Sequence, residues 1–426
     1  ACALGADAVA AAIGRAAADR GIEVELVRNG SRGACWLEPL VEVETATGRM
    51  AFGPVDPAEV VALFDAGFPG EADHPLALGP VTGIGWLASQ QRLTFTRAGW
   101  TDPLSLDDYR ALGGFDGLAR ALDMSAQEIV DEVKESGLRG RGGAAFPTGI
   151  KWQTVLDAAG DRKFIVCNAD EGDSGTFADR LLMESDPYQL IEGMTIAGLA
   201  VGAQEGFIYL RSEYPHCKAV LTDALARAEQ AGYLGDALCG GERRFRIELR
   251  IGAGAYICGE ETSLLESLEG KRGLVRFKPP LPAIKGLLGL PTVVNNVLSL
   301  AAVTTILAKG AGYYRDFGSG RSRGTLTAQL AGNIKRGGLV EVPFGITLRQ
   351  LLQDYGGGSA SGRPIRAVQL GGPSGGCIPG SLLDTRIDYE DLKATGAIMG
   401  SGGMIVADET TCMVDLSRYF LAFTQD

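Results

Sequence analysis

The residues best suited to chemistry lie in segment 137–152, where sixteen residues include five glycines, three cations and two aromatics. Glycines allow positive φ and let successive backbone N–H groups converge on one anion. Arg139, Arg141 and Lys151 would add positive potential, and the aromatic rings could lie against a planar ligand. The segment therefore predicts a phosphate-binding loop with an aromatic wall.

The spacing of Gly140, Gly142 and Ala145 fits the G-x-G-x-x-A dinucleotide fingerprint, which normally follows a strand. Here the preceding residues 125–136 predict a helix, because apolar residues recur four apart among charged ones. This pattern disfavours an ordinary Rossmann turn and favours a phosphate loop of another kind. A flexible turn without a ligand is the alternative.

Acidic and amide side chains follow the strand predicted at 164–166, namely Asn168, Asp170, Glu171 and Asp173. Ligands of open α/β sheets bind beyond the carboxyl ends of the strands. An asparagine can both donate to and accept from a flavin or base edge, and carboxylates can accept from sugar hydroxyls. The alternative interpretation is a solvated acidic loop.

A second strand, predicted at 246–251, leads to Glu260 and Glu261 at the start of a helix predicted at 262–268. Helix dipoles favour carboxylates at this position, so helix capping is the alternative function. Carboxylates there would accept ribose hydroxyls and repel a 2′-phosphate, which favours NAD over NADP.

A third group combines Lys278, on a stiff proline segment, with Asn295 and Asn296, which open a helix. Asparagine at such a position is often only an N-cap. The other motifs favour a ligand-binding role for the two asparagines.

Composition excludes several classes of protein. The chain has 426 residues, 46% of them hydrophobic and 22% charged, which is typical of a soluble protein of several domains. A net charge of −12 disfavours nucleic acid and anionic membranes as partners. The most apolar run, 293–308, is too short to span a bilayer.

The numbers and positions of cysteines and histidines limit the reactions that we expect of this chain. Eight scattered cysteines without a C-x-x-C pair predict no metal site and a reducing, cytoplasmic location. Two histidines argue against proton-shuttling hydrolysis. Hydride transfer between cofactors tolerates this scarcity, because the cofactors carry the chemistry.

We predict an α/β multidomain fold. In residues 1–100 we expect a small α/β domain with a helix at 3–18, strands at 23–27, 36–45 and 50–53, and a helix at 56–64. Residues 101–320 alternate strands with helices, which predicts a mostly parallel sheet covered on both faces. Residues 321–393 predict a β-grasp unit, and 394–426 a glycine-rich turn, a short strand at 405–406 and a helix at 413–423.

Five ordered segments resemble the flavin-bearing, NADH-oxidising subunit of respiratory complex I and the diaphorase subunits of NAD-reducing hydrogenases and soluble formate dehydrogenases: 140–152, 168–176, 252–261, 278–283 and 293–296. The resemblance covers roughly residues 125–426. The N-terminal domain looks like the thioredoxin-like domain of the soluble dehydrogenases. The β subunit of a soluble NAD-dependent formate dehydrogenase is therefore the preferred member, with hydrogenase and complex I subunits as alternatives.

The resemblance implies a site. FMN would be held by Gly140, Arg141, Gly142, Gly143, Lys151, Asn168, Asp170, Glu171, Tyr256, Gly259, Glu260, Glu261, Val294, Asn295 and Asn296. NADH would meet Phe146, Glu171, Asp173, Glu261 and Lys278, and the catalytic residues would be Glu171 and Glu260. Thr154 and Leu281 stand where relatives often have aromatics, and Asp173 where a longer Glu is common, so we expect weaker adenine stacking and NADH affinity.

The resemblance also implies domain identities. Residues 1–100 would be thioredoxin-like, without a cluster because only Cys2 and Cys35 are present, and 101–320 a Rossmann-like FMN- and NADH-binding domain. Residues 394–426 would begin a helical iron–sulfur domain whose 4Fe-4S ligands are missing, because Cys412 alone cannot hold a cluster. We expect a shortened or incompletely ordered chain.

The implied activity is hydride exchange between NAD(H) and FMN, followed by single-electron transfer to iron–sulfur subunits. The implied partners are a small 2Fe-2S thioredoxin-like subunit and a catalytic dehydrogenase subunit. A noncatalytic docking scaffold and a free-standing NADH:acceptor oxidoreductase are the other hypotheses. The sequence does not choose among formate, hydrogen and quinone as the distant redox partner.

Overall fold

Strand β4 (Phe164–Ala169) lies at the centre of the computed structural model, which describes residues 1–426 except positions 71 and 426. It belongs to a four-stranded parallel sheet of order β6-β5-β4-β7, with β5 (Glu205–Leu210), β6 (Arg246–Ile251) and β7 (Thr292–Asn296). The surrounding helices are α4 (Leu106–Ala111), α5 (Asp116–Leu122), α6 (Ala126–Glu135), α7 (Thr148–Asp157), α8 (Ala178–Ser185), α9 (Pro187–Val201), α10 (Pro215–Gln230), α11 (Glu261–Leu268), α12 (Pro282–Lys285), α13 (Val297–Lys309) and α14 (Ala311–Arg315). The predicted parallel sheet is confirmed.

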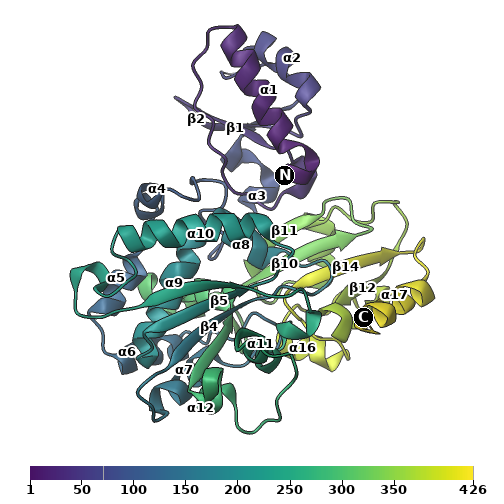
Figure 1. The fold of residues 1–426 in the computed structure, drawn as a ribbon. Coiled ribbons are helices and arrows are strands. Elements are labelled where there is room, and N and C mark those ends of the chain that lie inside the picture. The colour runs from purple at the N-terminus through teal and green to yellow at the C-terminus, as the bar shows by residue number, and fades with distance from the viewer. Residues whose placement is uncertain (71, 426) are drawn as a thin grey trace.

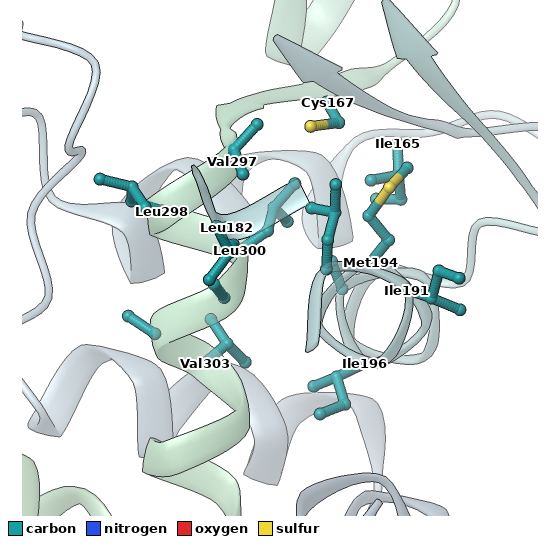
Figure 2. Close-up of a cluster of buried hydrophobic side chains, with 14 of the residues drawn as sticks. Ile165, Cys167, Leu182, Ile191, Met194, Ile196, Val297, Leu298, Leu300 and Val303 are labelled. Carbon is teal, nitrogen blue, oxygen red and sulfur yellow. The ribbon is translucent and has the colours of Figure 1, made fainter. Parts of the chain in front are cut away.

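Side chains of β4 alternate between two cores, because successive residues of a strand point to opposite faces. Ile165 and Cys167 lie in the larger core, together with apolar residues of α9 and α13 (Figure 2). Phe164 and Val166 lie in a smaller core that includes Leu264 of α11. Helices therefore cover both faces and leave the strand ends free to form a site.

The N-terminal lobe stands apart from the rest of the chain (Figure 1). It contains α1 (Ala6–Asp19), β1 (Val41–Thr45), β2 (Gly48–Phe52), α2 (Val60–Asp65) and β3 (Ala77–Pro80). The next helix, α3 (Gly85–Ala88), instead packs Trp86 into a core of the C-terminal part of the chain. The strands form an antiparallel sheet of order β1-β2-β3. One face of α1 packs with Phe52 and Leu63 in a separate core.

Two expectations for this lobe need correction. The strand expected at 23–27 pairs with no other strand, and both it and β1 line a groove of about 570 Å³. No neighbouring backbone among the described residues supplies its ladder hydrogen bonds. The strand expected at 36–45 begins only at Val41, after a 3₁₀ turn at Cys35–Leu37. The thioredoxin-like assignment stays a prediction.

The C-terminal part forms a second, mixed sheet of order β11-β10-β14-β12-β13. Its elements are β10 (Thr325–Gly332), β11 (Gly338–Pro343), α15 (Leu348–Gln350), β12 (Ile365–Leu370), β13 (Gly376–Pro379), α16 (Tyr389–Ala394) and β14 (Gly403–Asp408), preceded by the hairpin β8 (Gly318–Ser319) and β9 (Ser322–Arg323) and followed by α17 (Met413–Gln425). Strand β14 pairs with β10 in parallel and with β12 antiparallel. It is therefore the middle strand, and the boundary expected at 394 does not separate it from this sheet.

Buried polar side chains link the second sheet to segment 93–95 and to helix α8. Glu341 of β11 accepts from the backbone N–H groups of Leu93, Thr94 and Phe95 at 2.8–3.0 Å. Gln329 of β10 accepts from the N–H of Ala178 at the start of α8.

No helix in the described part of the chain is both long and apolar enough to cross a bilayer.

Helix α7, which carries Lys151 and Trp152, can lie close to α6 only because residue 149 is glycine. A Cβ on Gly149 would lie 2.7 Å from the backbone nitrogen of Lys134. We expect Gly149→Ala to lower the free energy of unfolding by about 1–3 kcal/mol, as overpacked cores do. Gly312→Ala is the matched control, because a Cβ there meets nothing within 4 Å. Urea denaturation that gave both variants equal stability would contradict this packing.

Candidate flavin and dinucleotide site

A cavity of about 430 Å³ lies at the carboxyl ends of β4 and β7. Its volume is within the range of about 300–1,000 Å³ typical of small-molecule sites. The wall contains these predicted residues: Gly140, Gly142, Phe146, Lys151, Asn168, Gly259, Glu260, Glu261, Lys278, Val294, Asn295 and Asn296. It also contains Thr154 and Leu281, and Phe146 is the aromatic residue among those that line it. The structure thus brings together all five segments singled out by sequence.

The glycine loop forms one wall. The N–H of Gly140 donates to the carbonyl of Phe146 at 2.9 Å, which closes the loop. Gly143 and Ala145 take positive φ of 104° and 52°. Among the described residues, the N–H groups of positions 142–145 find no protein acceptor. A row of free backbone donors beside a cavity is suited to an anion.

Only Lys151 of the loop's three cations reaches the cavity. Its ammonium donates to the carbonyl of Val294 at 2.8 Å and lies 3.5 Å from Glu261. Burial lowers its pKa, although Glu261 opposes this shift. Arg139 is directed elsewhere, to the carbonyl of Ala145 and to Glu390.

The prediction that Arg141 binds FMN is not supported by the position of its side chain. Only 8% of Arg141 is exposed, and its guanidinium donates to the Tyr314 hydroxyl at 2.8 Å and to the carbonyl of Arg323 at 2.7 Å. It also donates to the Tyr389 hydroxyl. Its backbone N–H donates to Ser299. A buried guanidinium needs several acceptors, and the joint with the second sheet provides them.

Charges on the opposite wall are paired. Lys278 donates to Glu260 at 2.8 Å and to Glu261 at 2.9 Å. Glu260 also accepts from the N–H groups of Thr262 and Ser263, so it is the N-cap of α11. Burial acts to raise the pKa of Glu260, but these hydrogen bonds and the Lys278 ammonium lower it overall. The helix-capping interpretation is correct for Glu260 without excluding a ligand.

The residues after β4 divide into two groups. Asn168 lies on the wall and donates to the carbonyl of Gly259 at 2.8 Å. Asp170 is off the wall, and its buried Oδ2 has no partner among the described residues. Burial raises its pKa to about 6. An orphaned buried oxygen calls for a donor, which suits a ligand hydroxyl or ring N–H.

Glu171, expected to be catalytic and to bind both cofactors, does not line the cavity. It is 6% exposed and accepts from the N–H groups of Asp179 and Arg180 at 3.1 and 3.0 Å and from the Tyr214 hydroxyl at 3.0 Å. Glu171 therefore satisfies the N-terminal donors of α8.

Asp173, Tyr256 and Gly143 flank the cavity without forming its wall. Tyr256 donates to Asp173 at 2.9 Å, and Ser401, in the loop before β14, also faces Asp173. Gly143 lies against the loop before β14, since a Cβ on Gly143 would be 3.3 Å from Gly400.

Both predicted asparagines line the cavity, and the amide oxygen of each is engaged within the protein. Asn295 accepts from the Trp152 indole N–H at 2.9 Å. Asn296 accepts from the N–H of Leu298 as N-cap of α13 and donates to Asp179 at 2.6 Å. Both amide atoms of Asn296 are therefore engaged, whereas the Asn295 Nδ2 has no protein acceptor among the described residues and can still donate to a ligand.

Sequence reasoning missed Ser299 and Asp179. Ser299 lies on the wall and holds the N–H of Arg141, one helical turn after the asparagine pair. Asp179 is 4% exposed and holds Asn296 from behind the floor. Its location three residues before apolar Leu182, on the buried side of α8, was the available signal.

These features fit FMN. The free N–H groups at 142–145 and Lys151 suit a phosphate, Asn168 can meet a ring edge, and Asp170 lacks a donor. Residues 133–305 match the family described as the Nuo51 FMN-binding domain. The fold and the site therefore define a flavin-binding oxidoreductase subunit.

Comparison with known proteins identifies the family of the chain. It is 50% identical over 337 residues to the NADP-reducing hydrogenase subunit HndC of Solidesulfovibrio fructosivorans, covering 79% of this chain and 69% of that protein. It is 47% identical over 319 residues to an NADH-quinone oxidoreductase subunit of Rhizobium meliloti, covering 75% of this chain and 76% of that protein. The chain thus belongs to the Nuo51 family and is an NADH dehydrogenase (diaphorase) subunit of a multisubunit enzyme.

A solved structure, the NAD+-reducing NiFe hydrogenase in its H2-reduced state, aligns with a TM-score of 0.67 and 31% identity. The alignment covers 88% of this chain and 61% of that one, so this chain spans less than two thirds of its length.

Arg141 and Lys151 should separate stability from anion binding. Arg141→Met would leave two tyrosine hydroxyls and a carbonyl without their donor, so we expect unfolding to become easier by about 1–3 kcal/mol. Lys151→Met should change stability less and weaken FMN binding roughly 10- to 100-fold, through loss of a charged hydrogen-bond donor. Denaturation and fluorescence titration measure the two effects, with the exposed Arg321→Met as control. An unchanged stability of Arg141→Met would contradict its assignment to the joint.

Proposed function

We propose that this chain binds FMN noncovalently in the cavity and exchanges hydride between NAD(H) and FMN within a hydrogenase-type or complex I-type assembly. The observation that carries the proposal is the row of free N–H groups at 142–145 beside Lys151, at the carboxyl end of a parallel sheet. The enzymes to which the relatives belong favour these assemblies over the formate dehydrogenase preferred from sequence.

Each wall has a role in this proposal. The glycine loop and Lys151 hold the phosphate, and Asn168 contacts the ring edge. When bound, FMN supplies a hydride acceptor that can pass electrons on one at a time. Phe146 and Leu281 give an apolar surface for the dinucleotide, and Lys278 exchanges its contacts with Glu260 and Glu261 for the ligand's phosphates.

Several finer assignments belong to the same proposal. Glu260 remains the candidate catalytic residue on the wall, whereas Glu171 acts from a buried position behind it. Asp173 and Tyr256 lie at the edge where a nicotinamide would enter. The partners are iron–sulfur electron-transfer subunits, which would include a 2Fe-2S thioredoxin-like subunit and a catalytic dehydrogenase subunit, and the location is cytoplasmic.

Reconstitution tests the proposal directly. The purified chain mixed with FMN should retain visible flavin absorption after gel filtration, and NADH should bleach that absorption anaerobically. A chain that retains no flavin, or flavin that NADH leaves oxidised, would show a docking scaffold instead. Turnover with quinone in the absence of any partner would instead favour a free-standing oxidoreductase.

The choice of dinucleotide is a separate prediction. Glu261 lies on the wall, and its carboxylate should repel a 2′-phosphate, so we expect NADH to be preferred over NADPH. Glu261→Gln should lower the ratio of kcat/KM for NADH to that for NADPH by roughly tenfold, equivalent to about 1.4 kcal/mol. Glu248→Gln, an exposed substitution on β6, is the control. An unchanged ratio would remove Glu261 from dinucleotide selection.

A further inference from the structure

Two buried carboxyl groups lie directly behind the cavity floor, and neither has an ion-pair partner in the described part of the chain. Asp179 and Glu171 are 4% and 6% exposed. The salt bridges of the structure include neither group. Two buried negative charges without a salt bridge are unfavourable, so we expect one of the two carboxyl groups to hold a proton.

The hydrogen bonds show which group is better suited to negative charge. Glu171 accepts from two backbone N–H groups and from Tyr214. Asp179 accepts one hydrogen bond, from Asn296. Hydrogen bonds to the charged form favour ionisation, so Glu171 is the anion and Asp179 keeps the proton.

Asp179 is connected to the cavity through Asn296. The Asn296 amide is fixed on one side by Asp179 at 2.6 Å and on the other by the N–H of Leu298 at 2.9 Å. The Asn296 side chain in turn supports the glycine loop, because a Cβ on Gly142 would lie 3.1 Å from the Asn296 Cβ. A change at Asp179 therefore reaches the anion-binding N–H groups through one residue.

We propose that Asp179 is a positioning residue for the flavin pocket, and that Asp179 must keep its proton for FMN to bind tightly. Loss of this proton places a second negative charge behind the floor, where it opposes the phosphate and disturbs Asn296. The inference rests on the proposed FMN site and concerns the control of cofactor affinity by this chain's own residues.

Other charged and titratable groups face the pair. They are Cys167 on β4, Asp173 after it, and Arg211 and Tyr214 between β5 and α10. Burial raises the pKa of both Asp179 and Glu171, and each interacts with the other. Burial also lowers the pKa of Lys151, so Lys151 is the competing cause of weaker FMN binding at alkaline pH.

The sign of the pH effect follows from linkage. If FMN binds the singly ionised pair, binding above its second ionisation must take up a proton, and the Kd rises by up to about tenfold per pH unit. We expect the Kd of the wild-type chain for FMN, from fluorescence titration, to rise about threefold or more between pH 7.5 and 9. The FMN phosphate is already doubly ionised across this range.

Neutral variants identify the source of the effect. Asp179→Asn keeps an acceptor for Asn296 and removes the titrating proton, so its Kd should vary less than about twofold over the same range. Glu171→Gln removes the same second ionisation and should flatten the profile too. Glu184→Gln, an acid on the same helix paired with Arg180, is the matched control and should keep the wild-type slope. Neutral variants that keep the wild-type slope would overturn the proposal and leave Lys151 as the cause.

Unfolding of the FMN-free chain gives a reading that does not depend on the cofactor. A group with a raised pKa in the folded state loses its stabilising contribution as pH rises through that pKa. The wild-type chain should therefore become easier to unfold between pH 7.5 and 9, and Asp179→Asn should lose less stability. If the wild-type chain binds no FMN at any pH, the proposed function fails, whereas FMN binding with identical wild-type and variant profiles overturns only the role of Asp179.

Discussion

The register of β4 against β7 is the constraint on which the site depends. Parallel pairing sets Asn168 opposite Asn296 and Cys167 opposite Asn295. Both strands therefore end at one level, and their last residues form the floor of the cavity. A slip of one residue would turn each side chain to the other face. It would break the contact between Asn295 and Trp152 and remove the cap of α13.

Charge around the cavity is arranged in two layers with different tasks. On the wall, Lys151 and Lys278 lie close to Glu260 and Glu261, so the charges largely balance in the ligand-free structure. An incoming phosphate competes with these carboxylates for the lysines. Behind the wall, Arg141 is committed to the tyrosines of the joint. In the proposed site, recognition of an anion therefore depends on the backbone N–H groups and two lysines, and not on Arg139 or Arg141.

The sequence was sufficient to predict the parallel sheet, the helix before the glycine loop and the gathering of five segments at one cavity. These predictions depend on periodicity and on strand–helix alternation, which are local signals. The contacts of individual side chains were harder to predict from the sequence. Arg141 and Glu171 have the residue types of ligand-binding groups, but both are buried. Arg141 bonds to residues far along the chain, and Glu171 bonds to the start of α8 and to Tyr214. The strand expected at 23–27 has suitable β-branched residues but no adjacent strand, which propensity alone cannot supply.

The glycine loop is held from two sides before any ligand arrives. Gly142 lies against Asn296 of the first sheet, and Gly143 lies against Gly400, in the loop before β14 of the second sheet. A Cβ at Gly142 would come unusually close to Asn296, and the positive φ of Gly143 also favours glycine. The free N–H groups at 142–145 are thus fixed by packing that folding has already completed. A phosphate bound there needs little reordering of the loop, which strengthens binding without additional contacts. The same packing makes the loop sensitive to residues behind it, because the close contact with Asn296 transmits any shift of that side chain to the loop.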